Sequence, residues 1–133
     1  MPKNYTLIEH TADIGIKIKG KNLKEVFKNS ALAMFDIMAE QRTEKITVKL
    51  KSDNLEELFV NWLNELLSLS AAKELIFTNI KIKRLGKNIL EAEVTGCGAK
   101  NYKFNTEIKA ATYHELEIRR AKSGWQARVI LDV

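Results

Sequence analysis

The chain has 133 residues, of which 45% are hydrophobic and 29% are charged, and its formal net charge is +5. This composition is typical of a soluble globular protein, and the length fits one domain over residues 1–133. No apolar run approaches the ~18 residues of a membrane span, and the first residues lack the apolar segment of a secretory signal. Cys97 is the only cysteine, which excludes an internal disulfide or a thiolate zinc site and favours a reducing, cytoplasmic setting.

The first half of the chain alternates predicted strands with predicted helices. Apolar residues at every second position predict strands over 5–9, 14–19 and 46–50. Apolar residues at 3.6-residue spacing predict an amphipathic helix over 23–39 and a second one from Leu55 onward, which carries the broadest apolar stripe.

Capping residues mark the start of both helices. Asn22 is followed three residues later by Glu25, which is the spacing of a reciprocal capping pair. Ser52, Asp53 and Asn54 are all candidate N-caps of the second helix, whose first turn is acidic as the helix dipole favours.

The second half of the chain is predicted to be all strand. Alternating apolar residues predict four strands, over 76–83, 90–94, 108–118 and 125–133. A glycine-containing hairpin joins the first two, and 95–100 is expected to be a loop. We therefore expect an α+β fold, with a mostly antiparallel mixed sheet of about six to seven strands packed against two amphipathic helices.

Two aspartates at strand ends define the main candidate site. Asp13 stands at the start of the second predicted strand, on the same parity as Lys17. Asp132 ends the last strand beside Val133, where the sequence stops, and shares the polar parity of Arg128. Because both parities are polar, neither aspartate is forced into the core. If the two strand ends meet, acidic oxygens from Asp13, Asp132 and the Val133 carboxylate would converge at one sheet edge.

Converging carboxylates repel one another unless a cation lies among them. A hard divalent ion with oxygen ligands is one solution, and Ca²⁺, Mg²⁺ and Mn²⁺ all fit that description. Arg128 or a lysine is the other, because surface carboxylates usually meet lysines or water. The residues by themselves leave both solutions open.

Both histidines lie on apolar parities. His10 shares that of Ile8, and His114 shares that of Leu116. A lone histidine on such a face is more often a satisfied core residue than a ligand. We therefore expect both histidines to lie in the core.

Other polar signals point to structure more than to chemistry. Glutamates interleave the lysines of the polar strand faces, which favours solvated sheet surfaces over a nucleic-acid platform. These lysines are Lys17, Lys19, Lys49, Lys51, Lys81 and Lys83. Gly96 and Gly98 lack the strand-to-helix setting of a phosphate loop, and Cys97 has no activating neighbour in the sequence.

Four segments together resemble the archease family. They are His-Thr-Ala-Asp at 10–13, Glu-Glu-Leu-Phe-Val-Asn-Trp-Leu-Asn-Glu-Leu-Leu at 56–67, Glu-Ile-Lys-Ala-Ala-Thr-Tyr-His-Glu-Leu-Glu-Ile at 107–118, and Val-Ile-Leu-Asp-Val at 129–133. Their order and spacing agree with the family over essentially the whole chain. Asn61 is a departure, since the family more often has aspartate before the tryptophan.

The resemblance implies a protein cofactor without catalysis of its own. Archeases act on the RNA-splicing ligase that joins tRNA halves and other broken RNAs, so RNA would be reached indirectly. They promote guanylylation and multiple turnover of the ligase and broaden its nucleotide use beyond GTP.

The resemblance also implies a metal site. The family's ligands would map onto Asp13, Asp132 and the main chain of Val133, with Ca²⁺ as the first expectation and Mg²⁺ or Mn²⁺ next. The candidate supporting residues are His10, His114 and Lys109.

Two other classes of function remain open on the residues. One is a small metal-dependent hydrolase, in which His10 or His114 acts as general base. The other is an RNA-binding or chaperone-like module that uses the lysine-bearing face.

Overall fold

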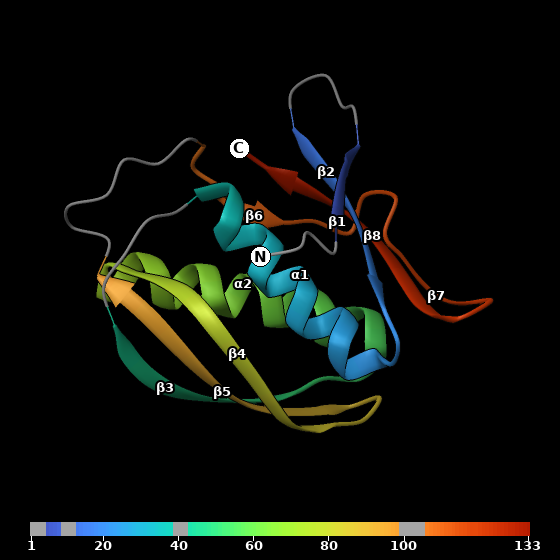
Figure 1. Ribbon diagram of the computed structural model, residues 1–133, viewed down its shortest axis with the longest axis horizontal. Helices are drawn as coiled ribbons and strands as arrows, with labels where there is room; N and C mark the ends of the chain where they lie inside the picture. Colours follow the sequence, from blue (N-terminus) through green and yellow to red (C-terminus); the bar gives the residue numbers. More distant parts are fainter. Residues whose placement is uncertain (1–4, 9–12, 39–42, 99–105) are drawn as a thin grey trace.

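The computed structural model describes residues 5–8, 13–38, 43–98 and 106–133. Within these ranges the chain forms two helices and two antiparallel sheets (Figure 1). Sheet A contains β1 (Tyr5–Ile8), β2 (Ile14–Gly20), β6 (Ala110–Ala111), β7 (Glu117–Ala121) and β8 (Gly124–Asp132). Sheet B contains β3 (Glu44–Lys51), β4 (Leu75–Leu85) and β5 (Ile89–Gly98). The helices are α1 (Leu23–Met38) and α2 (Leu55–Lys73).

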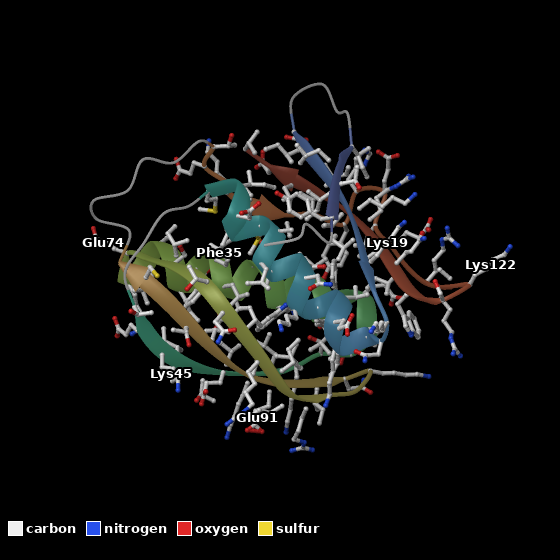
Figure 2. All side chains as sticks on the ribbon, viewed as in Figure 1. Lys19, Phe35, Lys45, Glu74, Glu91 and Lys122 are labelled. Atoms are coloured by element: carbon white, nitrogen blue, oxygen red, sulfur yellow. The ribbon has the colours of Figure 1, made fainter. Side chains whose placement is uncertain are left out.

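The helices lie between the two sheets (Figure 1). α1 contacts β4 of sheet B and β2 of sheet A, and α2 contacts β4 and β6. Both helices are apolar along one broad stripe, so each can bury side chains against both sheets. Phe35 of α1 meets Phe77 of β4 edge to face at 5.2 Å, and Figure 2 shows Phe35 in this layer. One continuous hydrophobic core results.

Trp62 joins the two helices at the centre of this core. Its side chain is fully buried, and its indole Nε1 donates a hydrogen bond of 3.0 Å to the carbonyl of Phe27. This contact satisfies the indole N–H, which a buried tryptophan requires. None of the described helices is long and apolar enough to cross a membrane.

The predicted helix caps are confirmed. Asn22 accepts a 3.0 Å hydrogen bond from the backbone N–H of Glu25, and the Glu25 carboxylate accepts one of 3.0 Å from Lys21 N–H. Of the three candidates before α2, the structure selects Asn54, which accepts from Glu57 N–H at 2.8 Å. The bonds from Glu25 N–H and Glu57 N–H satisfy first-turn donors, which have no partner inside the helix.

The predicted α+β class, with antiparallel strands on two amphipathic helices, is confirmed. The strands are eight in the described ranges and divide between two sheets. The reason is that β1 pairs with β2 and β2 pairs with the C-terminal β8, while β3 and β4 both pair with β5. Periodicity within a strand carries no information about such long-range pairing.

Two local predictions are wrong. Residues 95–98, expected in a loop, continue β5, because Gly96 lets the strand pass beneath Phe77, whose ring would lie 2.9 Å from a Cβ. The single strand expected over 108–118 is split into β6 and β7. Thr112 donates from both its N–H and its hydroxyl to the Ile130 carbonyl, and a turn with Glu115 at φ 53° follows.

Candidate functional site

Asp13 and Asp132 lie at the same end of sheet A. β2 and β8 pair antiparallel, and the last pair of this ladder joins Ile14 to Leu131. One residue further along each strand come Asp13 and Asp132. Figure 1 shows the start of β2 and the end of β8 at the top of the view. The strand ends therefore meet in the way that a shared carboxylate site needs.

β6 holds the end of β8 from its other side. Ala110 pairs with Asp132, and Lys109 N–H donates a 2.8 Å hydrogen bond to the Asp132 carbonyl. The Lys109 side chain is exposed, so its described contact with the candidate site is through the backbone. The β8 terminus is thus built into the sheet on both edges.

Asn64 of α2 anchors β6 to the helical layer. Its side-chain Nδ2 donates to the Ala111 carbonyl at 3.0 Å, and its Oδ1 accepts from Ala111 N–H at 2.7 Å. The amide therefore satisfies both backbone groups of a residue in a strand of only two residues. In the sequence, Asn64 falls outside the apolar stripe of its helix. An asparagine amide has both a donor and an acceptor, so it can bond the backbone of a strand although it belongs to a helix. That capacity is the feature of Asn64 that the sequence analysis missed.

The aspartates are accessible to solvent. Asp132 is exposed and Asp13 is half-buried. Within the described ranges no ion pair involves either carboxylate. Arg128, the alternative cation considered from the sequence, has its guanidinium 4.0 Å from Glu115.

The histidine predictions have different outcomes. His114 is exposed in the connection between β6 and β7, and its Nε2 lies 3.3 Å from a Glu115 carboxylate oxygen. The expected core position for His114 is therefore wrong, because the β6–β7 turn breaks the parity that it appeared to share. Ala111, not Ala110, is the buried residue of β6. His10 lies outside the described residues.

The acidic groups fit a hard cation in chemical type. Among the described residues no group of three or more His, Cys, Asp and Glu side chains is arranged to hold a metal ion. The candidate set contains two such side chains, Asp13 and Asp132, and its third contribution is main-chain oxygen at Val133. Carboxylate and main-chain oxygens are ligands that Ca²⁺ prefers.

Asn61, which the resemblance marks as a departure, donates a hydrogen bond. Its Nδ2 donates a 3.1 Å hydrogen bond to the Ser52 hydroxyl, at the start of α2. A carboxylate at this position has no N–H to donate, so the amide makes a contact that the more usual aspartate would make only as acceptor.

Two exposed apolar side chains accompany this end of sheet A. Leu7 of β1 is 60% exposed and Tyr113, just after β6, is 56% exposed. They are the exposed large hydrophobic residues of the described ranges. β1, which carries Leu7 opposite Ile16, and β6, which precedes Tyr113, flank the β2–β8 pair.

These features define a class of protein: a small α+β fold with two helices between antiparallel sheets and two aspartates at one end of a sheet. The chain belongs to the Archease protein family, whose model matches residues 5–133. This confirms the resemblance drawn from the four sequence segments.

Relatives of nearly the same length support this membership. The protein archease of Methanosarcina barkeri is 39% identical over 141 residues, covering 98% of this chain and 97% of the relative. The protein archease of Pyrococcus furiosus is 35% identical over 135 residues, covering 94% of this chain and 95% of the relative.

Solved structures share the fold. The solution structure of Methanobacterium thermoautotrophicum protein 1598 has a TM-score of 0.72 and 29% identity, covering 99% of this chain and 100% of that one. A crystal structure from Thermotoga maritima, described as an archease and possible chaperone, has a TM-score of 0.73 and 28% identity, covering 95% and 94%.

Proposed function

We propose that this protein is a cofactor that activates the RNA-splicing ligase in tRNA splicing and RNA repair. It promotes guanylylation of the ligase, supports multiple turnover and broadens nucleotide use beyond GTP. The observation that carries the proposal is family membership over residues 5–133. The position of Asp13 and Asp132, each one residue beyond the Ile14–Leu131 pair, supports it, since two carboxylates at one sheet end would suit a divalent ion.

The proposed metal ligands are Asp13, Asp132 and main-chain oxygen of Val133. A divalent ion held there would supply charge neutralisation for nucleotidyl transfer, the chemistry on which such reactions depend. The β2–β8 and β6–β8 pairings orient the residues that carry these oxygens. Asn64 does not contact the ion in this proposal; it is a positioning residue that holds β6 against α2.

The proposed docking surface is the carboxylate end of sheet A. Exposed apolar side chains can mark protein-binding surfaces, and tyrosine is enriched among the residues that carry the binding energy. Leu7 and Tyr113 are such side chains, and both belong to segments that border the β2–β8 pair. Docking through them would present the carboxylates to the ligase active site, with the ligase performing all covalent steps.

The test is a guanylylation assay of the ligase with and without this protein, using GTP and then ATP. The wild-type protein should raise turnover at substoichiometric amounts. Asp13→Ala and Asp132→Ala should remove the stimulation while the fold is retained, because both side chains are solvent-accessible.

Glu91→Ala and Glu93→Ala on sheet B serve as matched controls, since they remove equal charge elsewhere and should leave the stimulation intact. Failure of the wild-type protein to stimulate the ligase would refute the proposal. Metal-dependent hydrolysis of phosphoesters by the isolated protein would assign it to the hydrolase class instead.

A further inference from the structure

In two segments that pair in sheet A, every charged side chain is basic. Residues 14–21 and 118–131 contain seven Lys and Arg side chains and no Asp or Glu. These side chains are Lys17, Lys19, Lys21, Arg119, Arg120, Lys122 and Arg128. The segments lie far apart in the sequence, so their common composition becomes a surface only through β2–β8 and β7–β8 pairing.

The strand register arranges the charges in rows across the sheet. In one row Lys17 faces Arg128, which in turn faces Glu117. In the next row Lys19 faces Gln126, which faces Arg119. The intervening residues Ile16, Ile18 and Ala127 are buried toward the helices. Lys17, Lys19, Arg119 and Arg128 therefore share the outer surface of sheet A, and we call these four residues the basic face. Glu117 lies on the same surface, with its carboxylate 2.6 Å from Arg119 Nε.

Lys17 and Arg128 form a like-charge pair in the middle of a sheet. Two positive charges that face each other on neighbouring strands destabilise the strand pairing. Arg128 lies 4.0 Å from Glu115 and Arg119 lies 2.6 Å from Glu117, whereas within the described ranges no ion pair involves Lys17 or Lys19. An anion laid across the rows would offset the repulsion, and charge complementarity therefore predicts a polyanionic partner.

The chemistry of the basic face fits RNA better than an acidic protein. Protein interfaces are depleted in charge at their centre and depend on apolar anchors. The exposed large apolar residues of the described ranges, Leu7 and Tyr113, belong to neither row. Trp125 is half-buried, with the guanidinium of Arg120 stacked 5.7 Å from its ring. Interfaces with nucleic acid are polar and strongly positive, as this face is.

The spacing also fits a linear polyanion. Same-face residues two apart on a strand lie ~6.6 Å apart along its axis, so the rows repeat at a regular interval. Figure 2 shows Lys19 and Lys122 on the side of the molecule formed by β2, β7 and β8. The charged surface thus continues from the rows to the tip of the β7–β8 hairpin.

We propose that the basic face binds the phosphate backbone of single-stranded RNA directly. This activity goes beyond ligase activation and needs neither the ligase nor a metal ion. It would place an RNA strand on the same sheet whose opposite end carries Asp13 and Asp132.

The test is fluorescence anisotropy of a labelled oligouridine with the isolated protein in the presence of EDTA. If Lys17, Lys19, Arg119 and Arg128 each neutralise one phosphate, log K should fall with log salt at a slope of about −2.8. The double variant Lys17→Gln and Lys19→Gln should reduce the slope by about 1.4, which corresponds to ~25-fold weaker binding at 0.1 M salt.

The matched control is Lys49→Gln with Lys51→Gln on sheet B, which removes the same charge and should change affinity far less. Equal weakening by both pairs would overturn the basic face as the site, and so would no binding by the wild-type protein. Competition by poly-glutamate as strong as by unlabelled RNA would assign the face to an acidic protein instead.

A second measurement needs no variant and so does not depend on variant folding. Acetylation of lysines in the wild-type protein, followed by mass spectrometry, should show RNA protecting Lys17 and Lys19 but not Lys45 and Lys83. Absence of protection would contradict the proposal. Ligase guanylylation, measured separately without RNA, distinguishes this outcome from a failure of the proposed function.

Discussion

The outer faces of the two sheets carry lysines with the same two-residue period but in different charge surroundings. On sheet B the central strand β5 supplies acids, so Lys49 faces Glu91 and Lys81 faces Glu93. On sheet A the central strand β8 supplies Arg128, which faces Lys17 on one side and Glu117 on the other. The cross-strand neighbour therefore decides whether a lysine belongs to a balanced surface or to a repulsive one.

Glu93 shows how sheet B balances its charge. Its two carboxylate oxygens lie 3.6 Å from Lys45 Nζ and 3.6 Å from Lys83 Nζ. Lys45 first and Lys83 next hold the pKa of Glu93 below its usual value. Sheet B thus fits the solvated surface expected from interleaved lysine and glutamate, while sheet A combines an acidic end with a basic face.

The largest expected effect concerns the acidic end of sheet A. Asp13→Asn and Asp132→Asn should each weaken Ca²⁺ binding at least ~10–100-fold, the range seen when only the supporting partners of metal ligands are removed. Isothermal titration calorimetry measures this affinity. Glu91→Gln and Glu93→Gln on sheet B are the controls, and a comparable loss in them would mean that the ion responds only to net charge.

The next effect concerns the different anchoring of α2 to the two sheets. Asn64→Ala should lower the free energy of unfolding by about 2 kcal/mol, because both backbone groups of buried Ala111 lose their partner. Asn61→Ala removes a single hydrogen bond to Ser52 and should cost about 0.5–1 kcal/mol. Urea denaturation compares the two. Equal losses would show that β6 does not depend on the Asn64 amide.

The edge of sheet A should show a dependence on alkaline pH. The Tyr5 hydroxyl donates a 2.8 Å hydrogen bond to Asp36 of α1. Burial of the hydroxyl is the main cause, and the hydrogen bond to Asp36 and its negative charge are the next causes, that raise the pKa of Tyr5 to about 12. The unfolded tyrosine ionises near pH ~10, so this contribution is complete below about 10 and is lost as pH rises through about 12.

Tyr5→Phe should cost about 1 kcal/mol at neutral pH and should remove this part of the alkaline loss. Denaturation midpoints of wild type and variant, measured at neutral pH and between about 10 and about 12, give the difference. A constant difference across that range would show that Tyr5 ionisation does not contribute.

The smallest expected effect is a change in stability whose sign should differ between the two sheets. Lys17→Glu places a carboxylate opposite Arg128 and should stabilise the protein by about 0.2–1 kcal/mol. Lys49→Glu places one opposite Glu91 and should destabilise it by a similar amount. Thermal melting at low salt measures both. The same sign for both variants would contradict the register-based account of the two faces.

Much of the site's location follows from local features of the sequence. Asp13 and Asp132 stand on polar parities beside strands whose alternation is clear, and the structure brings these strand ends together. Their role as metal ligands stays a prediction. His114 could not be placed in the same way, because its apparent parity crosses a turn that depends on Thr112 reaching Ile130.

The sequence by itself determined where both helices begin and where β2, β3, β4 and β8 run, since capping bonds and hydrophobic period act within a few residues. Only the tertiary structure decided that the strands form two sheets, that Asn64 anchors β6, and that Lys17 faces Arg128. Those outcomes depend on which distant segments pair and in what register, and a single strand's pattern does not encode its partner.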